Sequence, residues 1–203
     1  MGYIKRELQD LLVAEFRDDR PKGVIVAGIV GCGKTTMIDE SLRTLSDKYD
    51  VFRFTGDDIV FRDAIARDTK HIQREIISKT QRRVIVFVDE VQKSGEIFDA
   101  LKFAFDESKI SFIVSGSNPD FLCTQARKRL QRRANFITLE PFSLPELLSH
   151  TGHVSLKMIS IFRELLSMTN FSSATQLIQQ NLKFDANILS IIQPYLIYGG
   201  LPL

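Results

Sequence analysis

The residues GVIVAGIVGCGKTTMIDESLRTL, from Gly23 to Leu45, contain three successive patterns. A short, continuous, β-branched run from Gly23 to Gly28 is typical of a strand that is buried on both faces. A glycine-rich turn follows, and the segment from Lys34 to Leu45 then repeats apolar residues at helical spacing. Strand, tight turn and helix in this order predict the first unit of a parallel α/β sheet.

The turn, from Gly28 to Thr36 (GIVGCGKTT), matches the pattern G-x-x-x-x-G-K-[ST] between a buried strand and a helix. Glycines adopt unusual backbone conformations and add no Cβ, so a ring of backbone N–H groups can surround phosphate oxygens. Lys34 is expected to reach the β- and γ-phosphates, Thr35 to ligate Mg²⁺ and Thr36 to contact the α-phosphate. The residues predicted to bind ATP or ADP are Gly28, Gly31, Cys32, Gly33, Lys34, Thr35 and Thr36.

Other interpretations of this turn are weaker. A dinucleotide-binding turn requires a third glycine at the position where Thr36 stands. Cys32 is interpreted as a small filler of the loop rather than as a redox switch. A glycine-rich turn followed by lysine and threonine by chance is the remaining alternative.

Four further strand-like runs follow, and amphipathic segments alternate with them. The strands are expected at residues 51–55, 84–88, 110–115 and 135–139. Helices are expected at 4–19, at 34–45, once or twice within 57–80, at 96–106 and at 119–130. This alternation predicts a three-layer α/β fold around a parallel five-stranded sheet.

The composition changes at Phe142, after which strand-like runs vanish. Helical patterns then occupy residues 143–150, 156–168, 174–181 and 188–198. We therefore expect an α/β core with its leading helix over residues 1–141, and a small C-terminal helical subdomain over residues 142–203.

An acidic pair ends the apolar run from Val84 to Val88, which gives Asp89-Glu90 the form of a Walker B segment. Ligands of open α/β sheets bind at the carboxyl ends of the strands. Asp89 is expected to hold Mg²⁺ through water, and Glu90 to orient or deprotonate an attacking water. This arrangement favours hydrolysis of ATP over transfer to an organic acceptor. The alternative is an acidic helix cap that follows a strand.

The segment Ser115-Gly116-Ser117-Asn118 ends the fourth predicted strand at the same edge of the sheet. A polar side chain there can sense the γ-phosphate, and Ser115 is the first candidate, with Asn118 the second. Ordinary turn chemistry explains the same four residues equally well.

Five of the seven residues from Arg127 to Arg133 (RKRLQRR) are basic. Three interpretations remain open for this segment. It is a solvated helix face, a source of an arginine that acts on a γ-phosphate within the chain or across a subunit interface, or a patch for nucleic-acid phosphates.

The composition excludes several classes of protein. The chain has 203 residues, 44% of them hydrophobic and 26% charged, with a formal net charge of +2, which excludes disorder. No apolar run approaches the roughly 20 residues of a membrane-spanning helix, and no secretory segment is recognised at the N-terminus. A cytoplasmic protein without a membrane partner is therefore expected, with Cys32 and Cys123 reduced.

Several segments together resemble the predicted prokaryotic AAA+-type ATPases, whose P-loop domain is usually followed by a restriction-endonuclease-like C-terminal domain. The segments are GIVGCGKTT, VIVFVDEVQK, FIVSGSN, RRANFITLEPFSLPEL and YLIYGGLP. The resemblance implies a P-loop NTPase fold with sheet order 5-1-4-3-2, a catalytic Glu90, a phosphate sensor at Ser115 and a functional arginine at Arg133. Arg132 stands where the family usually has glycine, so either arginine is a candidate. The family's C-terminal effector domain would lie outside these residues.

The leading functional hypothesis is a Mg²⁺-dependent ATPase of the AAA+ type that acts as a nucleotide switch or motor. An arginine acting across an interface would require a homo-oligomer. Two alternatives belong to other classes. One is a P-loop kinase in which the segment from Arg127 to Arg133 clamps phosphate, and the other is a nucleic-acid-binding or loading ATPase that uses the same segment.

Overall fold

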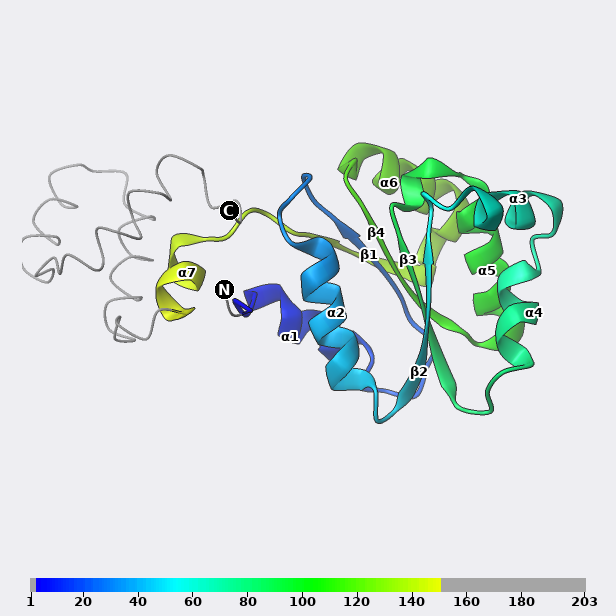
Figure 1. The fold of residues 1–203 in the computed structure, drawn as a ribbon, viewed down its shortest axis with the longest axis horizontal. Helices are drawn as coiled ribbons and strands as arrows, with labels where there is room; N and C mark the ends of the chain where they lie inside the picture. The colour runs from blue at the N-terminus through cyan, green and yellow to red at the C-terminus, as the bar shows by residue number, and fades with distance from the viewer. Residues whose placement is uncertain (1–2, 151–203) are drawn as a thin grey trace, which may run out of the picture. The chain divides into compact units, whose positions relative to one another are not determined.

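The computed structural model describes residues 3–150, and residues 8–139 form a five-stranded parallel sheet with helices on both faces (Figure 1). The strands are β1 (Gly23–Ala27), β2 (Tyr49–Thr55), β3 (Arg83–Asp89), β4 (Ser111–Gly116) and β5 (Ala134–Thr138). The α-helices are α1 (Glu7–Glu15), α2 (Lys34–Leu45), α3 (Ile59–Arg67), α4 (His71–Ile77), α5 (Glu96–Ser108), α6 (Pro119–Gln125) and α7 (Leu144–His150). Three short helical turns complete the set, η1 (Val91–Lys93), η2 (Ala126–Leu130) and η3 (Gln131–Arg133).

The sheet has the strand order β2-β3-β4-β1-β5, with every neighbouring pair parallel. This is the predicted order 5-1-4-3-2 read from the opposite side, so the predicted three-layer α/β fold is confirmed. Parallel strands place all their carboxyl ends at one edge of the sheet and all their amino ends at the other. We refer to these below as the carboxyl edge and the amino edge.

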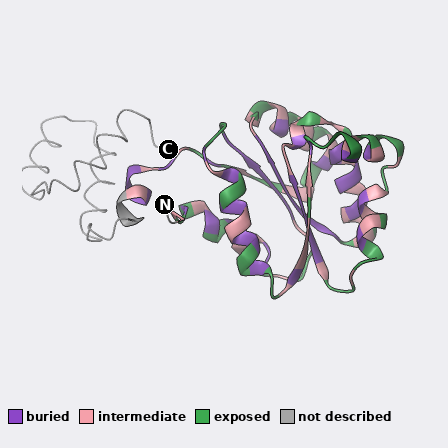
Figure 2. Cartoon of the chain, viewed as in Figure 1, coloured by how far each residue is buried: buried purple, intermediate pink, exposed green. Residues whose placement is uncertain are grey.

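Two buried clusters hold the layers together, and the central strands supply both (Figure 2). Ile25 and Ala27 of β1 face the cluster that includes residues of α3, α4, α5 and α6. Val24 and Val26 face the other cluster, which includes residues of α1 and α2. Each fully buried aliphatic side chain contributes roughly 1.5–3 kcal/mol relative to an exposed one. The continuous apolar run of β1 therefore suits an interior strand, between β4 and β5.

The helix predicted at residues 119–130 is regular only as far as Gln125. The chain continues as a π-helical turn, η2, and then as the 3₁₀ turn η3. In this wider turn Leu130 is fully buried, while Arg129 pairs with Asp99 of α5. Because the helical period changes here, Leu130 can be buried while Arg129 of the same segment reaches Asp99.

The region predicted as one or two helices within residues 57–80 contains two, α3 and α4. Asp58 caps the first, because its Oδ1 accepts hydrogen bonds from the backbone N–H of Val60 (2.8 Å) and Phe61 (3.3 Å). Asp68 is extended and ends it. Asp58 therefore fixes the start of α3, and the break between α3 and α4 lies at Asp68.

The chain divides into two compact units, and residues 8–139 form one of them. Among the described residues, 3–7 and 140–150 belong to the other. There the buried guanidinium of Arg6 donates from Nε to Glu146 Oε1 at 3.0 Å. Burial raises the pKa of Glu146, but hydrogen bonds from the backbone of Ser143 and Glu7 and from Arg6 outweigh it and leave that pKa below its usual value.

The predicted boundary at residue 141 stays a prediction. The helical segments predicted at 156–168, 174–181 and 188–198 lie outside the described residues. Within the described part of the chain, no helix is long and apolar enough to cross a membrane.

Candidate functional site

The predicted phosphate-binding turn links β1 to α2 at the carboxyl edge. Gly31 and Gly33 have φ values of 80° and 89°, in the left-handed region that favours glycine. A Cβ on Gly28 would lie 2.3 Å from the carbonyl oxygen of Leu139, so this position also requires glycine. The glycines thus permit both the direction of the turn and the close approach of a neighbouring backbone.

Lys34 is the first residue of α2, and its side chain folds back over the turn. Its Nζ donates to the carbonyl oxygens of Gly28 and Ile29, both at 2.9 Å, and the residue is only 6% exposed. Cys32 is fully buried, close to Gly28, which fits a filler of the loop. Thr36 is exposed on the first turn of α2. The ammonium group therefore lies in the hollow of the turn, where its present partners are neutral carbonyls.

Asp89, at the end of β3, accepts hydrogen bonds from three donors. Thr35 Oγ1 donates to its Oδ2 at 2.8 Å, the hydroxyl of Ser115 donates to its Oδ1, and the backbone N–H of Glu90 donates to the same oxygen at 3.0 Å. Three residues predicted independently, on α2, β3 and β4, are thus brought into one hydrogen-bonded group. Hydroxyl and carboxylate oxygens are the ligand types that Mg²⁺ prefers.

A metal site built from protein side chains alone is not seen in the described residues, where no group of three or more His, Cys, Asp or Glu side chains gathers. The pair Thr35 and Asp89 suits a different kind of site, because Mg²⁺ usually keeps several waters and binds one or two carboxylates together with substrate phosphates. The residues present therefore fit a Mg²⁺ ion that arrives with a nucleotide.

Glu90 follows Asp89 with φ at 50°, a left-handed conformation that turns the chain from β3 into η1. Its Oε2 accepts a hydrogen bond from Nε2 of Gln92, and the same nitrogen lies 3.1 Å from Ser117 Oγ. Neither Gln92 nor Ser117 is assigned a role by a sequence motif. Asn118, the second candidate for a phosphate sensor, instead caps α6, because its Oδ1 accepts from the N–H of Phe121 at 3.0 Å.

Arg133 lies at the amino edge, not at the carboxyl edge. The next residue, Ala134, pairs with Gly23 at the start of β1. The five residues of β1 span about 16 Å at roughly 3.3 Å per residue, and they separate Arg133 from the turn that follows β1. The structure therefore does not bring Arg133 to the phosphate-binding turn of its own chain.

The basic segment from Arg127 to Arg133 is tied to α5 at two points. Arg129 pairs with Asp99 and also donates to Gln125 Oε1 at 2.9 Å. Arg133 Nε donates to Asp106 Oδ1 at 2.6 Å, and this hydrogen bond lowers the pKa of Asp106. Arg127, Lys128 and Arg132 are exposed. Two of the five cations thus have a structural role, which reduces the basic surface that the segment offers.

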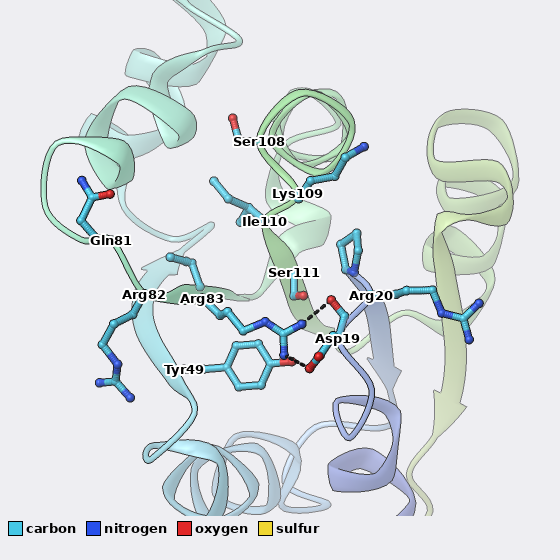
Figure 3. Close-up of a pocket in the computed structure, with 12 residues that line it drawn as sticks. Asp19, Arg20, Tyr49, Gln81, Arg82, Arg83, Ser108, Lys109, Ile110 and Ser111 are labelled. Atoms are coloured by element: carbon cyan, nitrogen blue, oxygen red, sulfur yellow. Dashed lines mark hydrogen bonds and ion pairs between the residues drawn. The ribbon is translucent and has the colours of Figure 1, made fainter.

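A cavity of about 250 Å³ opens at the amino edge, among the loops that precede β1, β3 and β4. Figure 3 shows the Arg83 side chain in it, directed at Asp19, with Nη1 donating to Oδ1 at 2.7 Å. Arg82 pairs with Asp50 at 2.7 Å. These cations already have anionic partners, and the cavity lies at the edge opposite to the one where open α/β sheets bind ligands.

Comparison with known proteins identifies the family. The family model described as an AAA domain matches residues 20–148, which include all five strands and both motifs of the carboxyl edge. The chain belongs to the AAA+ P-loop ATPases. Among curated proteins no significant match was found.

Two solved structures show the same AAA+ fold. The Orc1 protein of Aeropyrum pernix, in a complex with DNA, is 17% identical with a TM-score of 0.51 over 71% of this chain and 46% of that chain. Hsp104 of S. cerevisiae, in a complex with ADP, is 16% identical with a TM-score of 0.54 over 81% of this chain and 25% of that chain. This chain thus spans less than half of either protein.

Membership of the AAA+ family supports an ATP-binding P-loop module, and the turn at residues 28–36 is the segment predicted to be its P-loop. In the AAA+ module, Thr35, Asp89 and Ser115 form one hydrogen-bonded group, with Glu90 adjacent to it. The predicted phosphate-binding turn and this hydrogen-bonded group lie within the residues that the family model matches.

Proposed function

We propose that this AAA+ module hydrolyses ATP in a Mg²⁺-dependent reaction at the carboxyl edge. The observation that supports this most strongly is the convergence of Thr35, Ser115 and the N–H of Glu90 on the carboxylate of Asp89. The group lies beside the N-terminus of α2, where backbone N–H groups and the helix dipole favour anions.

Lys34 and the helix N-terminus would bind the phosphates. The Nζ of Lys34 would exchange the carbonyls of Gly28 and Ile29 for β- and γ-phosphate oxygens, a change from neutral to charged acceptors. The hydroxyl of Thr35 and the carboxylate of Asp89 would hold Mg²⁺. When bound, the ion neutralises charge on the phosphate oxygens and orients them.

Glu90 would orient the attacking water and accept its proton, and Ser115 would respond to the γ-phosphate through its bond to Asp89. Water would be the acceptor because Glu90 lies next to the proposed phosphate site, where it can accept the proton of an attacking water. The kinase alternative needs a mobile phosphate clamp, and the ion pairs of Arg129 and Arg133 with α5 count against one.

Arg132 or Arg133 would act on a γ-phosphate from a second copy of the chain. The amino edge of one copy would then face the P-loop of the next, and Arg132 and Arg133 would be the candidates. Arg132 is exposed, whereas Arg133 is engaged by Asp106. We therefore favour Arg132 in a homo-oligomer in which the nucleotide state acts as a switch or motor. An effector domain outside these residues, and nucleic acid bound by Arg127, Lys128 and Arg132, remain further parts of the proposal.

The test compares the native chain with Glu90→Gln in two assays. Phosphate release with Mg²⁺ and ATP should fall by about 100- to 10,000-fold, the usual range for loss of a general base. ATP affinity, measured by calorimetry, should change by less than a few-fold, because the amide keeps the size of the side chain. Glu107→Gln, at an exposed position on α5, is the matched control and should leave both values unchanged. Unchanged phosphate release by Glu90→Gln would contradict the assignment.

A further inference from the structure

We propose that Gln92 is a positioning residue that orients the Glu90 carboxylate and links it to the turn after β4. This inference rests on the proposed ATP hydrolysis, because it assigns a role through Glu90. No sequence motif assigns a function to Gln92, and the structure places its side-chain amide between Glu90 and Ser117.

The backbone of Glu90 is fixed from two sides before its side chain is considered. The N–H of Gly56 donates to the carbonyl of Asp89 at 2.8 Å, and a Cβ on Gly56 would lie 2.2 Å from the carbonyl oxygen of Glu90. That oxygen in turn accepts from the N–H of Lys93 at 3.1 Å and closes η1. With the backbone held at a φ of 50°, the direction of the carboxylate depends on its side-chain torsions and on the partner that holds it.

Gln92 is that partner, and the orientation of its amide is decided by the charge of Glu90. Nε2 faces Oε2 of Glu90, whereas Oε1 is buried and has no hydrogen-bond partner among the described residues. Rotating the amide by half a turn would place its oxygen against the carboxylate oxygen, and two acceptors repel each other. Oε1 of Gln92 therefore stays without a hydrogen bond while Nε2 donates to Glu90. This indicates that the contact with Glu90 determines the orientation of the amide.

Gly116 provides the room for the buried carbonyl. A Cβ at this position would lie 2.2 Å from Oε1 of Gln92, so any other residue would displace the amide. Gly116 stands between Ser115, which donates to Asp89, and Ser117, which contacts Gln92. Two parallel bridges thus join the ends of β3 and β4, one to the carboxylate proposed to hold Mg²⁺ and one to the carboxylate proposed to activate water.

As a consequence, Gln92 would couple the position of the Glu90 carboxylate to that of the Asp89 carboxylate. A shift of Ser115 toward a γ-phosphate moves the same short turn that carries Ser117. Gln92 transmits that position to Glu90 because one nitrogen contacts both residues. Gln92 would not touch the nucleotide, so its loss should reduce the rate of the chemical step and leave binding intact.

The experiment replaces Gln92 with Met, which has a similar length and no donor, in the full chain. We expect kcat for ATP hydrolysis to fall about tenfold or more, because a misplaced catalytic group can cost up to about 100-fold, while KM and ATP affinity stay within twofold. Gln92→Glu should lower kcat at least as far, since it sets a second carboxylate beside Glu90. In the Glu90→Gln background, Gln92→Met should cause no further loss, because the group that it positions is already absent.

Matched controls come from a second glutamine–serine pair in the same molecule. Gln73 on α4 donates to Ser108 at the end of α5, away from the carboxyl edge. Gln73→Met and Ser108→Ala should keep native kcat, whereas Ser117→Ala should show part of the Gln92→Met defect. If Gln92→Met and Gln73→Met lose the same fraction of kcat, the effect of Gln92→Met is general destabilisation and the proposal is overturned.

A spectroscopic readout separates this proposal from the ATPase proposal. The side-chain amide signal of Gln92 in a ¹⁵N–¹H spectrum, identified by its loss in Gln92→Met, should shift in Glu90→Gln, while the Gln73 signal should not. If the signal shifts but the native chain releases no phosphate, the contact stands and the ATPase proposal fails. If the chain hydrolyses ATP but Gln92→Met has native or higher kcat, the positioning role is wrong. The same conclusion follows if the chain hydrolyses ATP but the Gln92 amide signal does not shift in Glu90→Gln.

Discussion

Asp89 and Glu90 at the carboxyl edge differ in their partners from three aspartates at the amino edge. At the carboxyl edge, Asp89 is held by hydroxyl groups and a backbone N–H, and Glu90 by a side-chain amide. At the amino edge, Asp19, Asp50 and Asp106 are each paired with an arginine. Neutral donors leave the negative charge of a carboxylate uncompensated, whereas a guanidinium neutralises it.

This difference distinguishes carboxylates that are available to a ligand from carboxylates that only stabilise the fold. An acidic group that is hydrogen-bonded but not neutralised can still attract a cation, and the donors can turn toward phosphate when it arrives. A carboxylate that is already paired with a guanidinium attracts a further cation only weakly. Proximity of acidic and basic residues in the sequence did not distinguish these cases, because each of the three aspartate–arginine pairs joins segments that are far apart in the chain.

The largest difference between the two edges is expected in ATP affinity when one lysine is replaced at each edge. Lys34→Ala removes a charged donor from the P-loop and should weaken ATP binding by about 10- to 100-fold, since hydrogen bonds to charged groups contribute roughly 1.5–3 kcal/mol. Lys109→Ala, at an exposed position beside the cavity of the amino edge, should leave ATP affinity unchanged. Calorimetric titration with ATP and Mg²⁺ measures both. Equal losses in the two variants would show that the edges do not differ.

A smaller effect concerns stability and pH at the amino edge. The hydrogen bond from Arg133 lowers the pKa of Asp106 in the folded state. A carboxyl group with a lowered folded-state pKa stabilises the protein above its unfolded pKa, about 3.9 for aspartate, and this contribution is lost as the pH falls through the folded value. Because the pair is partly exposed, Asp106→Asn should cost only about 0.2–1 kcal/mol at pH 7.

Urea unfolding of the native chain and of Asp106→Asn at pH 7 and at successively lower pH measures this difference. We expect the gap between the two proteins to close below about pH 4, where the carboxyl group becomes protonated. Hydrolysis of ATP at pH 7 should be the same in both. A gap that widens as the pH falls would contradict the sign of the pKa shift.

Much of the fold and of the proposed nucleotide site could be predicted because the signals are local. The buried run of β1, the glycines of the P-loop and the helical spacing after Lys34 are each visible within a few residues. The group of Thr35, Asp89 and Ser115 was also predictable, because parallel strands bring their carboxyl ends together.

The rest depends on the register of distant segments and on unusual backbone. Arg133 was placed near phosphate by resemblance, and only the pairing of Ala134 with Gly23 shows that it lies at the amino edge. Gln92 reaches Glu90 because that residue adopts a φ of 50° and starts a 3₁₀ turn, which the apolar pattern of β3 does not reveal. The π-helical turn likewise reflects a pairing with α5 that spacing alone did not indicate.

Hydrogen–deuterium exchange with and without ATP and Mg²⁺ tests the central claim most directly, with Glu90→Gln used to keep the nucleotide intact. We predict slower exchange in peptides covering residues 28–36, 89–92 and 115–117, and unchanged exchange in peptides covering 19–22, 81–83 and 108–111. Protection confined to the second set, or no protection of the P-loop, would contradict the assignment of the carboxyl edge as the nucleotide site.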